Sequence, residues 1–109
     1  MNLFSRAFFA ADLAAEKIFG EDWQLNGRSW PSIRVEPLTA ETKLTLGTQF
    51  RDAHTRIEVR RMIFEQSGVK EGDLVTIRGE TLRFEGIESD VTDSVMMILG
   101  PAALRMPRR

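Results

Sequence analysis

The chain has 109 residues, of which 42% are hydrophobic and 28% are charged, the balance of one globular domain with a modest core. It contains no cysteine, which excludes disulfides, thiolate metal sites and thiol nucleophiles. Its formal net charge of -1 gives no general electrostatic reason to bind nucleic acid or an anionic membrane, so such binding would need a local basic patch.

An amphipathic helix is expected over residues 1–20, because Asn2 suits its N-cap and Gly20 suits the left-handed position after its last turn. Its apolar face contains Phe4, Phe8, Ala11, Ala15, Ile18 and Phe19. Phe9 and Leu13 fall among the charged positions on the opposite side. These two side chains indicate either a second contact surface or cover by loops of the same chain.

Short strands are expected after residue 20, where the helical period ends. The dipeptide Asn26-Gly27 predicts a tight turn between two of them. The apolar residues around this turn are Trp23, Leu25, Trp30, Ile33 and Val35. Pro31 and Pro37 restrict these strands to edge or terminal positions, because proline cannot donate to a sheet ladder.

Residues 36–53 are expected to form a long loop or a protruding hairpin. Threonine and charged residues dominate this stretch, and the apolar residues Leu38, Leu44, Leu46 and Phe50 are scattered through it. A long, weakly patterned connection in a compact domain is usually functional or mobile. The alternative is an ordinary hairpin whose apolar residues cap the sheet.

The clearest strand signals lie in the second half of the chain. Alternating residues predict a strand over 55–64. The stretch 72–87 predicts a tight hairpin that turns at Gly79-Glu80, with glycine as the first central residue. The apolar run from Val95 to Leu99 predicts a last strand buried on both faces.

Together these elements predict an α+β fold that is mainly β, with an amino-terminal helix and a small, twisted antiparallel sheet or barrel of roughly five or six strands. We expect a single domain over residues 1–109. Its parts are the helix at 1–20, a β-core at 21–100 that includes the long loop at 36–53, and a flexible basic tail at 101–109.

Residues suited to catalysis are scarce, since the chain has one histidine, no cysteine and no tyrosine. His54 lies among charged residues, which is typical of a solvated side chain. Glu85, Glu88, Asp90 and Asp93 lack the alternating ligands and central glycine of a calcium loop. We therefore expect no enzymatic activity, metal, cofactor or small-molecule substrate.

A cluster of arginines supports an alternative function. Arg51, Arg56, Arg60 and Arg61 lie close together in the sequence, and Phe50 adjoins them. Basic side chains beside an aromatic ring are typical of grooves that bind single-stranded nucleic acid. A small β-barrel that binds nucleic acid is therefore kept as the alternative function.

A resemblance to a known family rests mainly on residues 55–100. Within them Gly72-Asp73 leads into the alternating stretch 74–77, a turn and the stretch 82–87, and the last apolar strand ends at Ile98-Leu99-Gly100. In this order of parts, in its length and in its arginine-rich end, the chain resembles the head-tail joining proteins of long-tailed bacteriophages and prophages, including the lambda-like tail-attachment, head-completion type.

The resemblance implies a structural protein that is made in the bacterial host cytoplasm and forms a ring at the head-tail junction of the virion. Its partners would be further copies of itself, the portal or adaptor of the filled head, and tail proteins, with DNA only as passing cargo and no membrane contact. Free subunits would associate weakly, and their amino-terminal segment and long loop would become ordered against neighbours. The expected assembly contacts are Phe9, Leu13, Leu38, Leu44, Leu46, Phe50, Arg105, Arg108 and Arg109.

Overall fold

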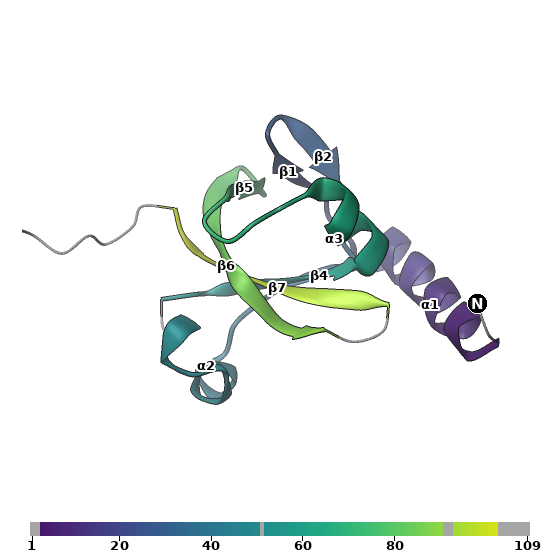
Figure 1. Ribbon diagram of the computed structural model, residues 1–109, viewed down its shortest axis with the longest axis horizontal. Helices are drawn as coiled ribbons and strands as arrows, with labels where there is room; N and C mark the ends of the chain where they lie inside the picture. Colours follow the sequence, from purple (N-terminus) through teal and green to yellow (C-terminus); the bar gives the residue numbers. More distant parts are fainter. Residues whose placement is uncertain (1–2, 51, 91–92, 103–109) are drawn as a thin grey trace, which may run out of the picture.

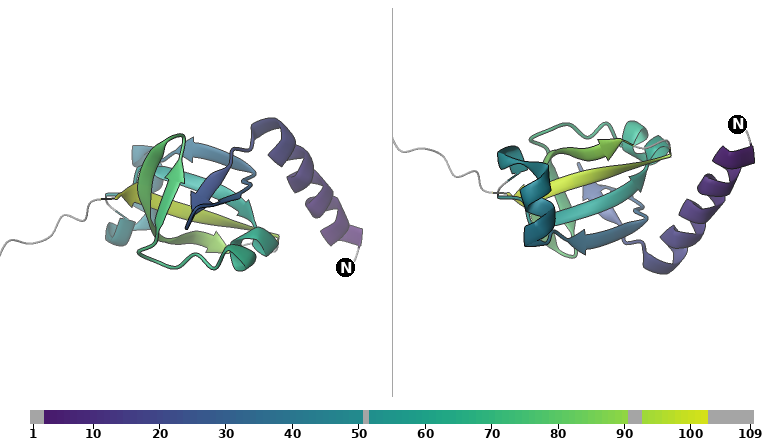
Figure 2. Two further views of the ribbon diagram at one scale, coloured as in Figure 1. Left: turned by 90° about the horizontal axis from the view of Figure 1, so that it is seen from above. Right: turned by 90° about the horizontal axis from the view of Figure 1, so that it is seen from below.

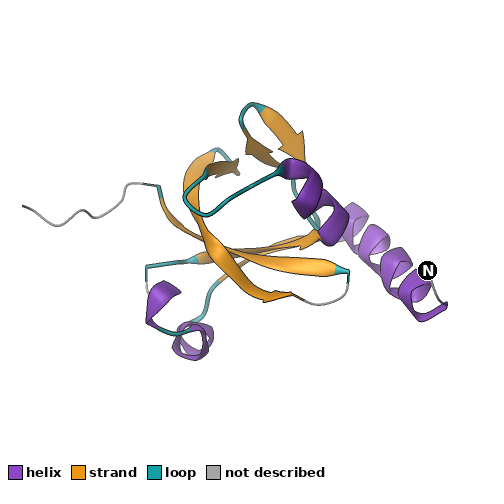
Figure 3. Cartoon of the chain, in the orientation of Figure 1, coloured by secondary structure: helices purple, strands orange, loops and turns teal. Residues whose placement is uncertain are grey.

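The structure is a computed structural model that describes residues 3–50, 52–90 and 93–102. Within these residues the chain forms three α-helices, one short 3₁₀ helix and seven strands (Figure 3). The helices are α1 (Leu3–Phe19), α2 (Ala40–Leu46), η1 (Thr48–Phe50) and α3 (Arg61–Ser67). The strands are β1 (Trp23–Leu25), β2 (Arg28–Trp30), β3 (Arg34–Pro37), β4 (Thr55–Arg60), β5 (Leu74–Ile77), β6 (Glu80–Asp90) and β7 (Ser94–Pro101). The prediction of an α+β, mainly β fold is confirmed.

The seven strands of the described residues form one sheet in the order β2-β1-β5-β6-β7-β4-β3. Every neighbouring pair is antiparallel, and the sheet curls into a half-barrel (Figures 1 and 2). Pro37 ends β3, an edge strand of the sheet, which is where the sequence predicted proline to lie.

Two tight hairpins close neighbouring strands. Asn26 and Gly27 have φ values of 56° and 79°, as the predicted turn requires. The turn between β5 and β6 is shifted by one residue from the prediction, because Arg78 and Gly79 are its central residues, with φ values of 54° and 76°. Ile77 pairs directly with Glu80, so the glycine takes the second central position.

The main hydrophobic cluster fills the inside of the curled sheet. It contains alternate residues of β7, namely Val95, Met97 and Leu99, together with residues of other strands and of α3. Trp23 is fully buried in the same cluster, and its indole Nε1 donates a hydrogen bond to the carbonyl oxygen of Pro31 at 3.0 Å. The predicted burial of β7 is confirmed.

The expected long loop at residues 36–53 is largely helical and covers the other face of β7. It contains α2 and η1, and it brings Phe50 against Ala53 and Ile98 in a second cluster. The Thr39 side chain caps α2 by accepting a hydrogen bond from the Thr42 amide at 3.1 Å. The expectation of an irregular loop is therefore wrong for residues 39–50.

The strand predicted for residues 55–64 is too long. β4 ends at Arg60, and α3 occupies the next residues. Gly68 ends α3 in the left-handed conformation, with φ of 70°, and its amide donates to the Glu65 carbonyl. The helix buries Ile63 against the main cluster.

Helix α1 leaves the sheet at a close backbone approach and extends away from it (Figures 1 and 2). A Cβ atom on Gly20 would collide with the carbonyl oxygen of Ser32, so only glycine fits at this position. Gly20 does not have the positive φ that the sequence interpretation assigned to it. Glycine is required at position 20 because two backbone segments approach closely there, not because the backbone is left-handed.

Candidate assembly surfaces

Helix α1 exposes large apolar side chains near its carboxyl-terminal end. Ile18 is 71% exposed and Phe19 is 60% exposed, although the sequence places both on the apolar face. Ala11 and Ala14 are exposed as well. A helix normally buries its apolar face on its own domain, so this face is available to another surface.

The side of α1 that carries Glu16 is the side held by the sheet. Glu16 Oε2 lies 2.5 Å from Arg60 Nε, and the two side chains are only 11% and 13% exposed. Leu13 lies on this side and is half-buried. The half-burial of Leu13 favours, of the two possibilities stated above, cover by other residues of the same chain.

A second exposed apolar side chain lies on α2. Leu44 is 83% exposed, whereas Leu38 and Leu46 pack partly against the second hydrophobic cluster. α1 and α2 lie at opposite ends of the long axis of the molecule (Figures 1 and 2). The exposed apolar side chains of the two helices therefore lie at opposite ends of the molecule.

Phe50 does not belong to the exposed surface. Its ring is 6% exposed, and a Cβ atom on Gly86 would lie 3.3 Å from one of its ring carbons. Gly86 also has a φ of 142°, which favours glycine. The assignment of Phe50 as an anchor that waits for a partner is corrected, because the ring is already covered by β6 and β7.

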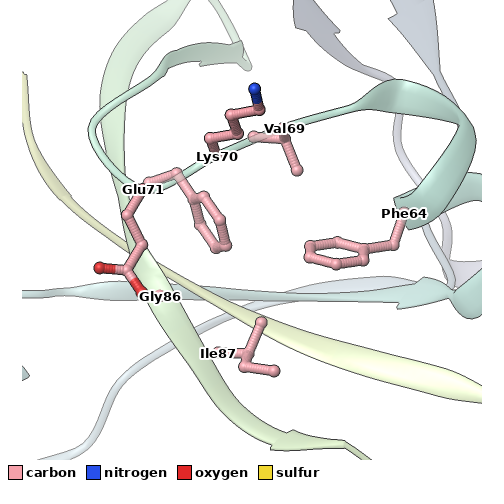
Figure 4. A pocket seen from close by; sticks show the side chains of 7 residues that line it. Phe64, Val69, Lys70, Glu71, Gly86 and Ile87 are labelled. Atoms are coloured by element: carbon pink, nitrogen blue, oxygen red, sulfur yellow. The ribbon is translucent and has the colours of Figure 1, made fainter.

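An open cavity of about 520 Å³ lies between the α3–β5 connection and β6, and we call it the β6 groove (Figure 4). It is lined by Phe64, Val69, Lys70, Glu71, Phe84, Gly86 and Ile87. Its walls are mainly apolar, and Ile87 is 38% exposed. The groove is a third surface of the molecule that could accept an apolar side chain.

A β-bulge shapes the β6 groove. Phe84 pairs with Leu99 and Gly86 pairs with Ile98, so Glu85 is an extra residue in β6. The extra residue puts Ile87 on the same face of the sheet as Phe84, where strict alternation would have put it on the opposite face. Sequence reasoning missed this groove, and the only local signal for the bulge is the glycine inside a strand pattern.

The arginines proposed for nucleic-acid binding are partly engaged inside the chain. Arg56 Nη1 lies 2.9 Å from Glu88 Oε1, and Arg56 Nε lies 3.4 Å from Glu36 Oε1. Burial by itself would lower the pKa of Arg56, but hydrogen bonds to these two carboxylates outweigh it and raise that pKa. Since Arg60 pairs with Glu16, these two guanidinium groups serve internal ion pairs.

The remaining parts of that alternative do not form a basic groove among the described residues. The aromatic partner expected beside the arginines is the buried Phe50 ring, which cannot stack on a base. Arg61 begins α3 and is half-buried. Arg51 lies outside the described residues.

Glu85, Glu88 and His54 each interact with a different residue among the described side chains. Glu85 pairs with Arg83 at 3.0 Å, Glu88 pairs with Arg56, and His54 Nδ1 lies 2.8 Å from the Thr55 hydroxyl. No group of three or more potential metal ligands occurs within residues 3–50, 52–90 and 93–102. In the same part of the chain no helix combines the length and apolar content needed to cross a bilayer.

Several expected contacts lie outside the described structure. Arg105, Arg108 and Arg109 belong to the undescribed carboxyl-terminal residues, and nothing of the Phe9 side chain is described. Of the other expected contacts, the structure brings Leu38, Leu46 and Phe50 together on one face of the sheet. It leaves Leu44 exposed and places Leu13 at the opposite end.

Comparison of the chain with protein-family models found no match, and neither did comparison with the curated proteins.

Proposed function

We propose that this protein is a structural subunit that forms a ring at the head-tail junction of a long-tailed bacteriophage or prophage particle. The observation that supports this proposal best is the pair of exposed apolar helices, α1 and α2, at opposite ends of the molecule. A subunit that joins two other structures needs unlike contact surfaces that point in different directions. The family resemblance implies that its partners are the portal or adaptor on one side and the tail on the other.

The energetics of these surfaces favour assembly on a template. Burial of Ile18, Phe19 or Leu44 contributes about 1.5–3 kcal/mol each. Association costs roughly 4–15 kcal/mol in lost rigid-body freedom, which is similar to the sum of these gains. Free subunits would therefore associate weakly, and a preformed ring of sites on the head would raise their effective concentration.

The ordering of residues 36–53 is not part of this mechanism. Because α2 is capped and Phe50 is already buried, docking of Leu44 requires little further ordering of the segment. A rigid projecting helix loses less conformational entropy on binding than a disordered loop does. We propose that α2 contacts either the head or the tail as a preformed element, in a virion assembled in the bacterial host cytoplasm.

An in vitro joining assay tests the proposal. Heads and tails are prepared from particles that lack this protein, the purified chain is added, and joined particles are counted by electron microscopy. We expect the wild-type chain to restore joining and Leu44→Asp to fold normally but to restore much less. Thr45→Asp is the matched control, since it adds the same charge to an exposed position of α2 and should retain joining.

Two outcomes would contradict the proposal. Heads and tails that join equally well without the chain would remove its role at the junction. Salt-sensitive binding of the purified chain to short oligonucleotides, together with no effect on joining, would favour the nucleic-acid alternative.

A further inference from the structure

We propose that α1 of one copy docks in the β6 groove of the next copy, with Ile18 beside Ile87. This inference rests on the proposed function and assigns one of its contacts, the contact between neighbouring subunits in the ring. In this proposal α1 binds a second copy of this chain, and α2 remains available to other proteins.

The first argument is that both surfaces are apolar and exposed. Ala11, Ala14 and Ile18 follow the i, i+3, i+7 spacing by which a helix anchors in an apolar groove, and all three are exposed. The β6 groove offers Phe64 and Ile87 as apolar walls (Figure 4). Both surfaces remain open in the isolated chain.

The second argument is charge. Lys17 is exposed beside Ile18, and no ion pair involves it among the described residues. Glu71 is exposed at the edge of the groove, and its Oε2 would lie 3.5 Å from a Cβ atom on Gly86, the residue before Ile87. Placing Ile18 beside Ile87 therefore brings a lysine to an unpaired carboxylate.

The third argument is geometry. α1 cannot turn its apolar face onto its own groove while Glu16 is held by Arg60 and Gly20 is packed against Ser32. The helix extends beyond its own sheet, where a neighbour can meet it (Figure 2). Because the two surfaces differ, the contact is head-to-tail and propagates from copy to copy, as a closed ring requires.

Disulfide trapping tests this contact, because the chain has no cysteine and every disulfide is then engineered. The full-length double variant Ile18→Cys/Ile87→Cys is oxidised at high concentration and separated on a denaturing gel. We expect a ladder of dimers, trimers and larger covalent oligomers. Each single variant alone should remain mainly monomeric, and a mixture of the two single variants should give mainly the mixed dimer.

Controls distinguish this contact from random collision and from other occupants of the groove. Leu44→Cys/Ile87→Cys pairs the groove with an equally exposed residue of α2 and should give no ladder. Leu104→Cys/Ile87→Cys tests the carboxyl-terminal residues as the occupant. A ladder from either control that matches the ladder of the proposed pair would overturn the inference, as would efficient dimerisation of Ile18→Cys alone, which would indicate an α1-to-α1 contact.

Charge reversal gives an independent test that leaves the groove walls intact. In the trapping background, Lys17→Glu or Glu71→Lys alone should slow ladder formation by roughly threefold to tenfold, since each puts like charges together. The combined reversal should restore the rate to within about twofold, because the pair is re-formed with opposite polarity. Additive losses in the combined variant would show that the two residues do not meet.

The trapping experiment tests the contact between copies, and the joining assay tests the proposed function, so either claim can be overturned without the other. A ladder with no effect of the chain on joining would keep the contact and overturn the proposed function. Joining that survives in Ile18→Asp, with no ladder from the cysteine pair, would keep the function and overturn the contact.

Discussion

At the scale of single residues, Phe50 shows how a side chain in an apparently irregular segment can belong to the core. Its ring lies over Gly86, on the face of the sheet opposite the main cluster, and contacts Ala53 and Ile98 in the second cluster. The sequence around Phe50 contains threonine and charged residues, so no periodic pattern marks it as buried. Its burial depends on Gly86, which lies far away in the sequence.

Replacing Phe50 with alanine should therefore destabilise the fold. Loss of a buried phenylalanine typically costs about 3–5 kcal/mol, through lost burial and the cavity that remains. The free energy of unfolding is measured by urea titration with circular dichroism. Leu44→Ala, a truncation in the same segment at an 83% exposed position, should change it by less than about 0.5 kcal/mol. Equal effects of the two variants would contradict the burial of Phe50.

At the scale of elements, the parts with strong local signals were predictable from the sequence. The hairpin of β5 and β6 was predicted from its alternation and its glycine turn, and β7 from its continuous apolar run. Helix α2 also has local signals, because Thr39 caps it and Gly47 follows it with φ of 93°. The hydrophobic pattern of the segment is nevertheless too weak to indicate a helix.

Other features depend on distant residues and could not be predicted locally. The rotation of α1 is fixed by Arg60, which lies far from Glu16 in the sequence, so the helical pattern alone did not predict that Ile18 and Phe19 are exposed. The β6 groove requires a bulge whose register is set by β7. The candidate surfaces are therefore less predictable than the sheet that carries them.

An exposed ion pair joins the segment after α1 to the β5–β6 hairpin and makes a small part of the stability depend on pH. Arg78 forms a double hydrogen bond with Glu21, through Nε at 2.6 Å and through Nη2. Hydrogen bonding to Arg78 lowers the pKa of Glu21, and outweighs the opposing effect of partial burial. The carboxylate form is thus favoured in the folded chain.

This lowered pKa fixes the sign of the effect. The stabilisation is present above the unfolded-state pKa of about 4.3, and it is lost as the pH falls through the lower folded-state pKa. Glu21→Gln should therefore be less stable than the wild type by about 0.2–1 kcal/mol at neutral pH, the range for exposed ion pairs. Urea titrations should show this difference shrinking toward zero at acid pH. A difference that grows on acidification would contradict the assignment.

At the scale of the whole molecule, the fold combines a well-packed half-barrel with a helix that its own chain covers poorly. The main cluster joins strands from both halves of the sequence, so the sheet should unfold as one unit. α1 is attached through the ion pair of Glu16 and the backbone contact at Gly20. An element with few buried contacts opens more readily than the core does.

Amide hydrogen exchange of the dilute chain should show this division. We expect slow exchange in β4, β6 and β7, intermediate exchange in α2 because Phe50 anchors its segment, and faster exchange in α1. Arg60→Gln should accelerate exchange in α1 by releasing Glu16, and leave β6 and β7 unchanged. If α1 instead exchanged at the same rate as the sheet in both proteins, it would unfold together with the core. That result would contradict the weak attachment of α1 to its own domain.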